Sequence, residues 1–131
     1  MSVPNIKAML LCDQVITEIE THKKSLIGVF ENILTATLPC QHSALSVYVK
    51  FTEAKGPYRF RLELVDLQSG QAIGRGEVPK LRYEDPLGTY ELAFNLRGLT
   101  FSHEGKYEFR LYANDQLMGH KAFEVKKIAG G

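Results

Sequence analysis

The 131-residue chain is almost neutral, with 16 basic and 15 acidic side chains and a net charge of +1. This balance gives no electrostatic attraction toward nucleic acid or anionic membranes. The apolar fraction of 44% is ordinary for a globular domain, and no apolar run reaches the roughly 18 residues of a membrane-spanning helix. We expect a single domain over residues 1–131, with neither nucleic acid nor a membrane as a partner.

The first residues, MSVPNIKAMLLCDQ, hold one lysine before a short apolar run that ends at Asp13. No small-residue cleavage site follows, so we interpret the run as a strand of the mature domain and expect a cytoplasmic location. Cys12 and Cys40 fit a reducing compartment, where cysteines are most often small buried hydrophobes. At the other end of the chain, Gly130–Gly131 is interpreted as a frayed tail.

The segment Cys12–Lys24, CDQVITEIETHKK, leaves its secondary structure open. Acidic residues come early and lysines late, as in a short helix, but β-branched residues occupy much of it and favour a strand equally well.

From Leu45 onward, apolar and polar residues alternate with period two, the pattern of strands with one face in the core. Turn residues separate the alternating runs. The three clearest runs are Leu45–Phe51, Tyr58–Leu64 and Tyr90–Leu96. The spacing predicts an all-β fold of about eight strands, an antiparallel β-sandwich with immunoglobulin-like or related Greek-key topology.

The stretch SHEGKYEFRLYANDQ at Ser102–Gln116 fits that class. In immunoglobulin-like sandwiches, a tyrosine near the start of a late strand bonds back to the backbone and fixes the corner between two strands. Gly105 and Tyr107 would form such a structural corner here. The alternative is that Tyr107 is an ordinary core residue, and in both interpretations its role is structural.

Three segments carry a resemblance to a known family: AMLLCDQVI near the start, SLIGVFENI at Ser25–Ile33, and GKYEFRLYAND. With them, the chain resembles an uncharacterised bacterial family of short cytoplasmic β-sandwich proteins, a domain of unknown function. The resemblance implies the fold and brings no catalytic, cofactor-binding or metal-binding residue with it.

Residues that could bind a metal ion or take part in catalysis do not form a recognisable site. Cys40 and His42 make one close ligand pair, whereas a structural zinc site usually has two. No nucleophile motif such as G-x-S-x-G occurs. Arg59 and Arg61 alternate with aromatic residues, so the two kinds face opposite sides of a strand and form no stacking platform for single-stranded nucleic acid. We expect no enzymatic activity, no cofactor and no metal.

The first third of the chain offers a candidate interface. In LIGVF, Leu26 and Phe30 lie on one side of a strand and Ile27 and Val29 on the other, so both faces are apolar. A sandwich covers only one of them. Either the Val15–Lys24 segment or the 34–39 loop covers the second face, or a partner does. We expect a homodimer or an unidentified protein partner there, and keep a small-ligand or metal-binding domain as the alternative.

Overall fold

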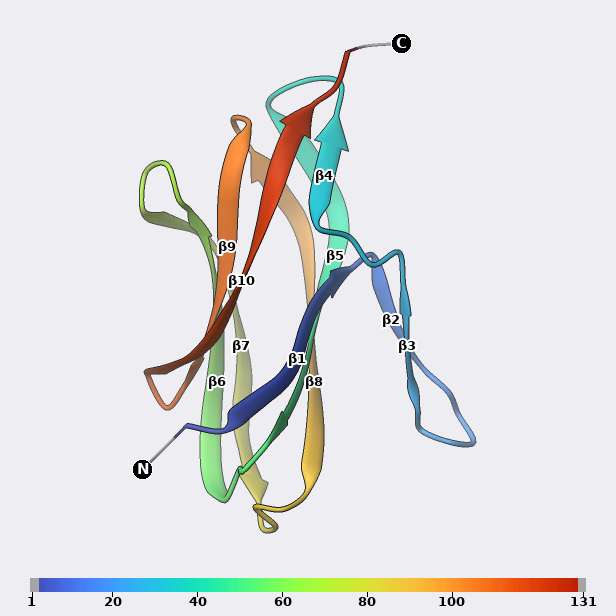
Figure 1. The fold of residues 1–131 in the computed structure, drawn as a ribbon, viewed down its shortest axis with the longest axis vertical. Coiled ribbons are helices and arrows are strands. Elements are labelled where there is room, and N and C mark those ends of the chain that lie inside the picture. The colour runs from blue at the N-terminus through green and yellow to red at the C-terminus, as the bar shows by residue number, and fades with distance from the viewer. Residues whose placement is uncertain (1–2, 130–131) are drawn as a thin grey trace.

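The computed structural model describes residues 3–129, so Gly130–Gly131 lies outside the described part. Two β-sheets pack face to face in this part, and a separate hairpin stands beside them (Figure 1). No helix among these residues is long and apolar enough to cross a bilayer. The strands are β1 (Asn5–Cys12), β2 (Gln14–Thr17), β3 (Lys24–Ile27), β4 (Asn32–Thr35), β5 (Cys40–Thr52), β6 (Gly56–Asp66), β7 (Gln71–Tyr83), β8 (Thr89–Phe101), β9 (Gly105–Ala113) and β10 (Gln116–Lys127).

The smaller sheet has the strand order β1-β5-β8 and the larger one β4-β10-β9-β6-β7, while β2 and β3 pair only with each other. All pairings are antiparallel except that of β4 with β10. The chain passes between the sheets from β5 to β6, from β7 to β8 and from β8 to β9, as in Greek-key sandwiches. The predicted all-β sandwich is confirmed. It has ten strands in residues 3–129, against about eight expected, because the first third contains short strands without a period-two pattern.

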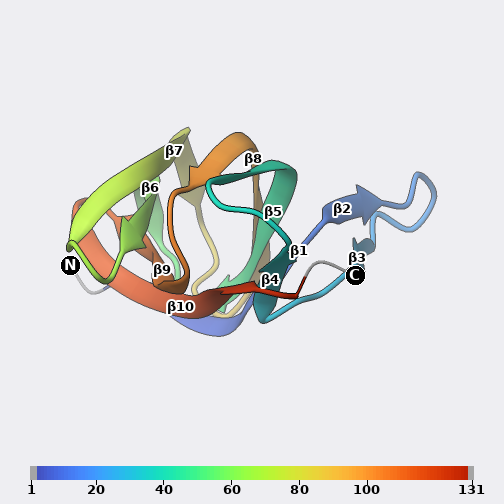
Figure 2. The ribbon, with the colours of Figure 1, turned by 90° about the horizontal axis from the view of Figure 1, so that it is seen from above.

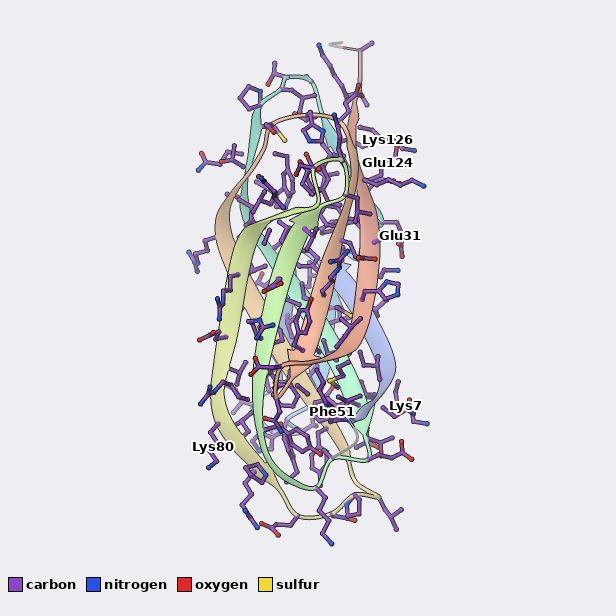
Figure 3. The ribbon with its side chains drawn as sticks, turned by 90° about the vertical axis from the view of Figure 1, so that its left-hand side faces the viewer. Lys7, Glu31, Phe51, Lys80, Glu124 and Lys126 are labelled. Atoms are coloured by element: carbon purple, nitrogen blue, oxygen red, sulfur yellow. The ribbon has the colours of Figure 1, made fainter. Side chains whose placement is uncertain are left out.

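The alternating runs build the core between the sheets. Phe51 of β5, Phe60 of β6 and Phe109 of β9 have no exposed surface. Figure 3 shows Phe51 between the sheets, whereas Lys7 and Lys80 point outward. Successive side chains of a strand point to opposite faces, so each run supplies one apolar row to the core and one polar row to the surface.

Tyr107 anchors the turn between β8 and β9. Its side chain is buried, and its hydroxyl donates a 2.8 Å hydrogen bond to the carbonyl oxygen of His103, four residues upstream. This is the geometry of a tyrosine corner. The ring stacks on Phe123 of β10 and meets Phe101 of β8 edge to face. Tyr107 therefore connects the two sheets through its ring and fixes the turn through its hydroxyl.

The two cysteines lie far apart in the smaller sheet. Cys12 of β1 pairs with Ser46 of β5, and Cys40 is six residues before Ser46 on the same strand. At about 3.3 Å per residue, the α-carbons are separated by roughly 20 Å. A disulfide needs them within about 7 Å. The fold therefore prevents an intramolecular bridge.

Replacing Tyr107 by Phe should lower the free energy of unfolding by about 1–2 kcal/mol, because the hydrogen bond to His103 is lost while the ring remains. Urea unfolding followed by fluorescence or circular dichroism measures the change. Tyr83→Phe is the matched control, since the Tyr83 hydroxyl makes no hydrogen bond within the described residues. Equal stability of the Tyr107→Phe and Tyr83→Phe variants would show that the hydrogen bond from Tyr107 to His103 does not stabilise the fold.

Titration of the unfolded chain with a thiol reagent, without reductant, should give two free thiols. In the folded protein Cys40 should react first, because Cys12 has no exposed surface. A result of zero thiols in a monomer would contradict the separation of the two strand positions.

Candidate functional site

The β2–β3 hairpin, here called the hairpin arm (Gln14–Ile27), projects from the sandwich, as the view from above shows (Figure 2). Its root is fixed by the backbone. The Asp13 N–H donates to the carbonyl oxygens of Ile27 and Gly28, and the Phe30 N–H donates to the carbonyl oxygen of Leu11. Gly28 has a φ of +70°, and a Cβ there would lie 2.3 Å from Oδ2 of Asp13. The root therefore requires glycine.

The register of the arm sorts its side chains onto two faces. Gln14 pairs with Ile27 and Ile16 with Ser25, so Ile16 and Ile27 share one face. Val15 and Leu26 form the next pair and share the opposite face. Val15 and Leu26 are half-buried, and Lys24 on the same face lines a hollow against the sandwich, which makes this face the inner one. The outer face carries Ile16 and Ile27, with 39% and 47% of their surfaces exposed.

The four predicted interface residues separate into two pairs. Leu26 and Phe30 are half-buried, and Phe30 packs against the core with its ring 6.1 Å from that of His42. Ile27 and Val29 are about half exposed. Within the described residues, neither the Val15–Lys24 segment nor the loop after β4 buries them. The exposed pair is thus Ile27, the last residue of β3, and Val29, which follows the turn at Gly28.

Sequence reasoning missed Ile16 as a third member of this surface. Ile16 belongs to the Cys12–Lys24 segment, for which the sequence allowed either a helix or a strand. A hairpin with its turn at residues 18–23 places Ile16 opposite Ser25 and therefore on the face of Ile27. Ile19, in the turn, is 91% exposed. Four of the ten exposed large aliphatic side chains of residues 3–129 therefore lie between positions 16 and 29.

Two hollows separate the inner side of the arm from the sandwich. The one near the root has a volume of about 610 Å³, with Asp13, Val15, His42, Asn95 and Arg97 among its lining residues. The one near the tip, of about 410 Å³, is here called the lysine hollow. It is lined by Lys23, Lys24, Lys50, Thr89 and Glu91.

The outer face of the smaller sheet, which borders both hollows, is held by paired polar groups. The Ser46 hydroxyl donates to Oδ1 of Asn95 at 2.6 Å. The buried Tyr48 hydroxyl donates to the carboxylate of Glu91. Burial, together with this hydrogen bond and the charge of Glu91, raises the pKa of Tyr48, so its proton stays in place. These polar groups thus already form hydrogen bonds with one another.

Chemically reactive groups do not gather at the site. Cys12 is buried, and burial raises the pKa of its thiol, which disfavours the thiolate that nucleophilic chemistry needs. Its Sγ lies near the carbonyl oxygens of Gln14 and Ser46. Across residues 3–129, no group of three or more His, Cys, Asp and Glu side chains could hold a metal ion.

A histidine–carboxylate pair lies at the tyrosine corner. Nδ1 of His103 is 2.6 Å from the carbonyl oxygen of Glu104, and Nε2 is 2.6 Å from Oδ2 of Asp66. A carbonyl oxygen and a carboxylate only accept, so both ring nitrogens must carry protons. These contacts raise the pKa of His103, the backbone contact most. Burial opposes the ionisation of Asp66, but its hydrogen bonds with His103 and two backbone amides still lower its pKa.

Fold and site together define an immunoglobulin-like β-sandwich with a projecting hairpin arm. A model of a family of unknown function, DUF6941, matches residues 7–126, and the chain belongs to that family. The expected membership in an uncharacterised family is thus confirmed. No curated protein matches.

Two solved structures show distant similarity to this chain. One is an immunoglobulin-like protein from Pseudomonas aeruginosa, 16% identical, with a TM-score of 0.41 over 95% of this chain and 98% of that one. The other is a beta-glucosidase from Kluyveromyces marxianus, 12% identical, with a TM-score of 0.45 over 76% of this chain and 15% of that one.

The His103–Asp66 pair should make stability depend on pH. A raised His103 pKa stabilises the fold below the ordinary value of 6.5, and this contribution is lost as pH rises through the folded pKa. A lowered Asp66 pKa stabilises the fold above the ordinary value of 3.8, and this is lost as pH falls through the folded pKa. The stability difference between wild type and His103→Gln should therefore be largest between about pH 3.8 and 6.5.

Urea unfolding at a series of pH values measures that difference. His120→Gln is the matched control, because the His120 imidazole faces Glu108 from a side chain that is 61% exposed. A wild-type-minus-His103→Gln difference that stays constant with pH would show that the pair does not titrate as described.

Proposed function

We propose that this protein is a non-enzymatic, cytoplasmic protein-binding module whose contact surface is the outer face of the hairpin arm. The observation that carries the proposal is the exposure of Ile16 and Ile27 on one face of a hairpin that stands clear of the sandwich, with exposed Val29 two residues after Ile27. Contiguous exposed apolar residues with polar surroundings favour protein contact. The simplest partner is a second copy of the chain, since two-fold pairing closes with a single surface.

The alternative, a small-ligand site, has weaker support. Ligand pockets are mostly apolar cavities with a few free polar groups that converge on the ligand. The polar groups that border the root hollow are partly satisfied by each other, as in the bond between Ser46 and Asn95. The cytoplasmic assignment is supported by Cys12 and Cys40, whose strand positions are too far apart for a bridge.

The size of the surface sets the strength of the contact. Full burial of one large aliphatic side chain contributes about 1.5–3 kcal/mol. Three residues that are already about half covered therefore contribute a few kcal/mol per copy before the costs of association. We expect a reversible dimer that depends on protein concentration.

Ile27→Lys should shift the protein from dimer to monomer, because it places a charge at the centre of the apolar row. Size-exclusion chromatography with light scattering over a range of concentrations measures the shift. Ile73→Lys on β7 is the matched control: Ile73 is 42% exposed, close to the value for Ile27, but lies away from the arm.

Three results would contradict the proposal. The wild type could be monomeric at every concentration tested. Ile73→Lys could weaken the dimer as much as Ile27→Lys. Ile27→Lys could also unfold the protein by circular dichroism, which would show that Ile27 is a core residue.

A further inference from the structure

The lysine hollow is lined by more positive than negative side chains. Lys23 and Lys24 come from the end of the arm's turn and the start of β3, while Lys50 comes from β5 of the sandwich. None of the ion pairs formed within residues 3–129 includes any of the three. Three ammonium groups around one space repel each other and favour an anionic occupant.

The carboxylate that could neutralise the hollow is already engaged. Glu91 lies directly opposite Lys50 in the pairing of β5 with β8. It nevertheless accepts the hydrogen bond of Tyr48 and forms no ion pair with Lys50. The Lys24 ammonium donates to a neutral group, the Thr17 hydroxyl, at 2.6 Å. The lining residues therefore carry a formal charge of +2, from three lysines and one glutamate.

The arm's own turn carries the complementary charge. Its sequence is Glu18-Ile19-Glu20, and all three residues are exposed. The turn has a defined shape: the Glu18 N–H donates to the Lys23 carbonyl oxygen, and the Thr21 hydroxyl donates to Oε2 of Glu18. Neither glutamate forms an ion pair within the described residues. Ile19 between them is 91% exposed.

We propose that the lysine hollow is a binding site for the Glu18–Glu20 turn of a second copy of this chain. The carboxylates of one copy meet the lysines of the other, and Ile19 is covered in the contact. Turn and hollow lie at the same end of the arm, so one two-fold axis can bring both reciprocal contacts together. This inference rests on the proposed function, since it takes the same partner, a second copy bound through the arm, and adds a polar contact on the arm's inner side.

Charge reversal on each side tests the site. Glu18→Lys/Glu20→Lys and Lys23→Glu/Lys24→Glu change only exposed residues. Each should weaken its own dimer by about tenfold or more in Kd, because attraction becomes repulsion. An equimolar mixture of the two variants should restore a dimer of wild-type affinity, because in the mixed dimer the reversed turn meets the reversed hollow and the unchanged turn meets the unchanged hollow. Analytical ultracentrifugation gives these constants, and circular dichroism verifies that each variant folds.

Two further measurements locate the contact. Lys50→Gln changes only the sandwich side of the hollow and should also weaken the dimer, whereas the outward-pointing lysines in Lys7→Glu/Lys80→Glu should not affect it (Figure 3). The wild-type dimer should weaken as salt is raised, since exposed charge pairs are screened.

The outcomes separate this inference from the proposed function. If the reversed variants dimerise like wild type while Ile27→Lys still gives a monomer, or if their mixture restores nothing, the lysine hollow is not the site and the apolar contact stands. An unchanged Lys50→Gln dimer would also overturn the hollow as the site. If the wild type is a monomer throughout, both proposals fail. Should either reversed variant not fold, Glu18→Gln/Glu20→Gln and Lys23→Gln/Lys24→Gln are measured in its place, with weaker dimers expected and unchanged ones decisive against the site.

Discussion

Each sheet of a two-layer sandwich can bury only one of its faces against the other sheet, and the rest of this structure depends on that constraint. It selects the period-two alternation of β5, β6, β8 and β9, because one row of each strand must be apolar and the other must meet water. It also explains the paired polar groups on the outer face of the smaller sheet, such as Tyr48 with Glu91. Apolar residues outside the two inner faces have no cover within the sandwich.

The hairpin arm is where the chain departs from this constraint. β1 contributes Leu11 to the core, and two residues later the chain turns out of the sheet at Asp13. The strands that follow pair only with each other, so the outer face and both outer edges of the arm remain available. Unpaired edges and exposed aliphatic residues are usually avoided in soluble monomers because they promote association. Their presence together on one element gives the arm its functional interest.

The sequence predicted the fold better than the arm, for a physical reason. A strand half-buried in a sandwich must alternate, so runs such as Tyr58–Leu64 announce both their secondary structure and their inward face. The strands of the arm are under no such requirement, and QVIT and KSLI are too short for a periodic signal. The sequence indicated both candidate rows, Leu26 with Phe30 and Ile27 with Val29, because apolar residues on both faces of a strand are conspicuous, but it did not decide which row faces outward. The hairpin turn that places Ile16 on the face of Ile27 was not predicted.

The lysine hollow could not be predicted from the sequence. Lys50 and Glu91 are far apart along the chain, and only the pairing of β5 with β8 makes them neighbours. Lys23 and Lys24 join them because of the direction in which the arm leaves the root. A site assembled across three elements in this way has no local pattern, and its charge excess is hidden in a chain whose net charge is only +1.

The glycine at the root of the hairpin arm separates the part of the arm that fixes its position from the part that is exposed. Because Gly28 sits against the Asp13 carboxylate in a backbone conformation that other residues rarely adopt, the arm's direction is set at this one position. The side chains of Ile16, Ile19 and Ile27 are exposed and lie outside the core, so substitutions there should cost the fold little. Under the proposed function, the sandwich can therefore present different contact sequences on the arm while the position of the root stays the same.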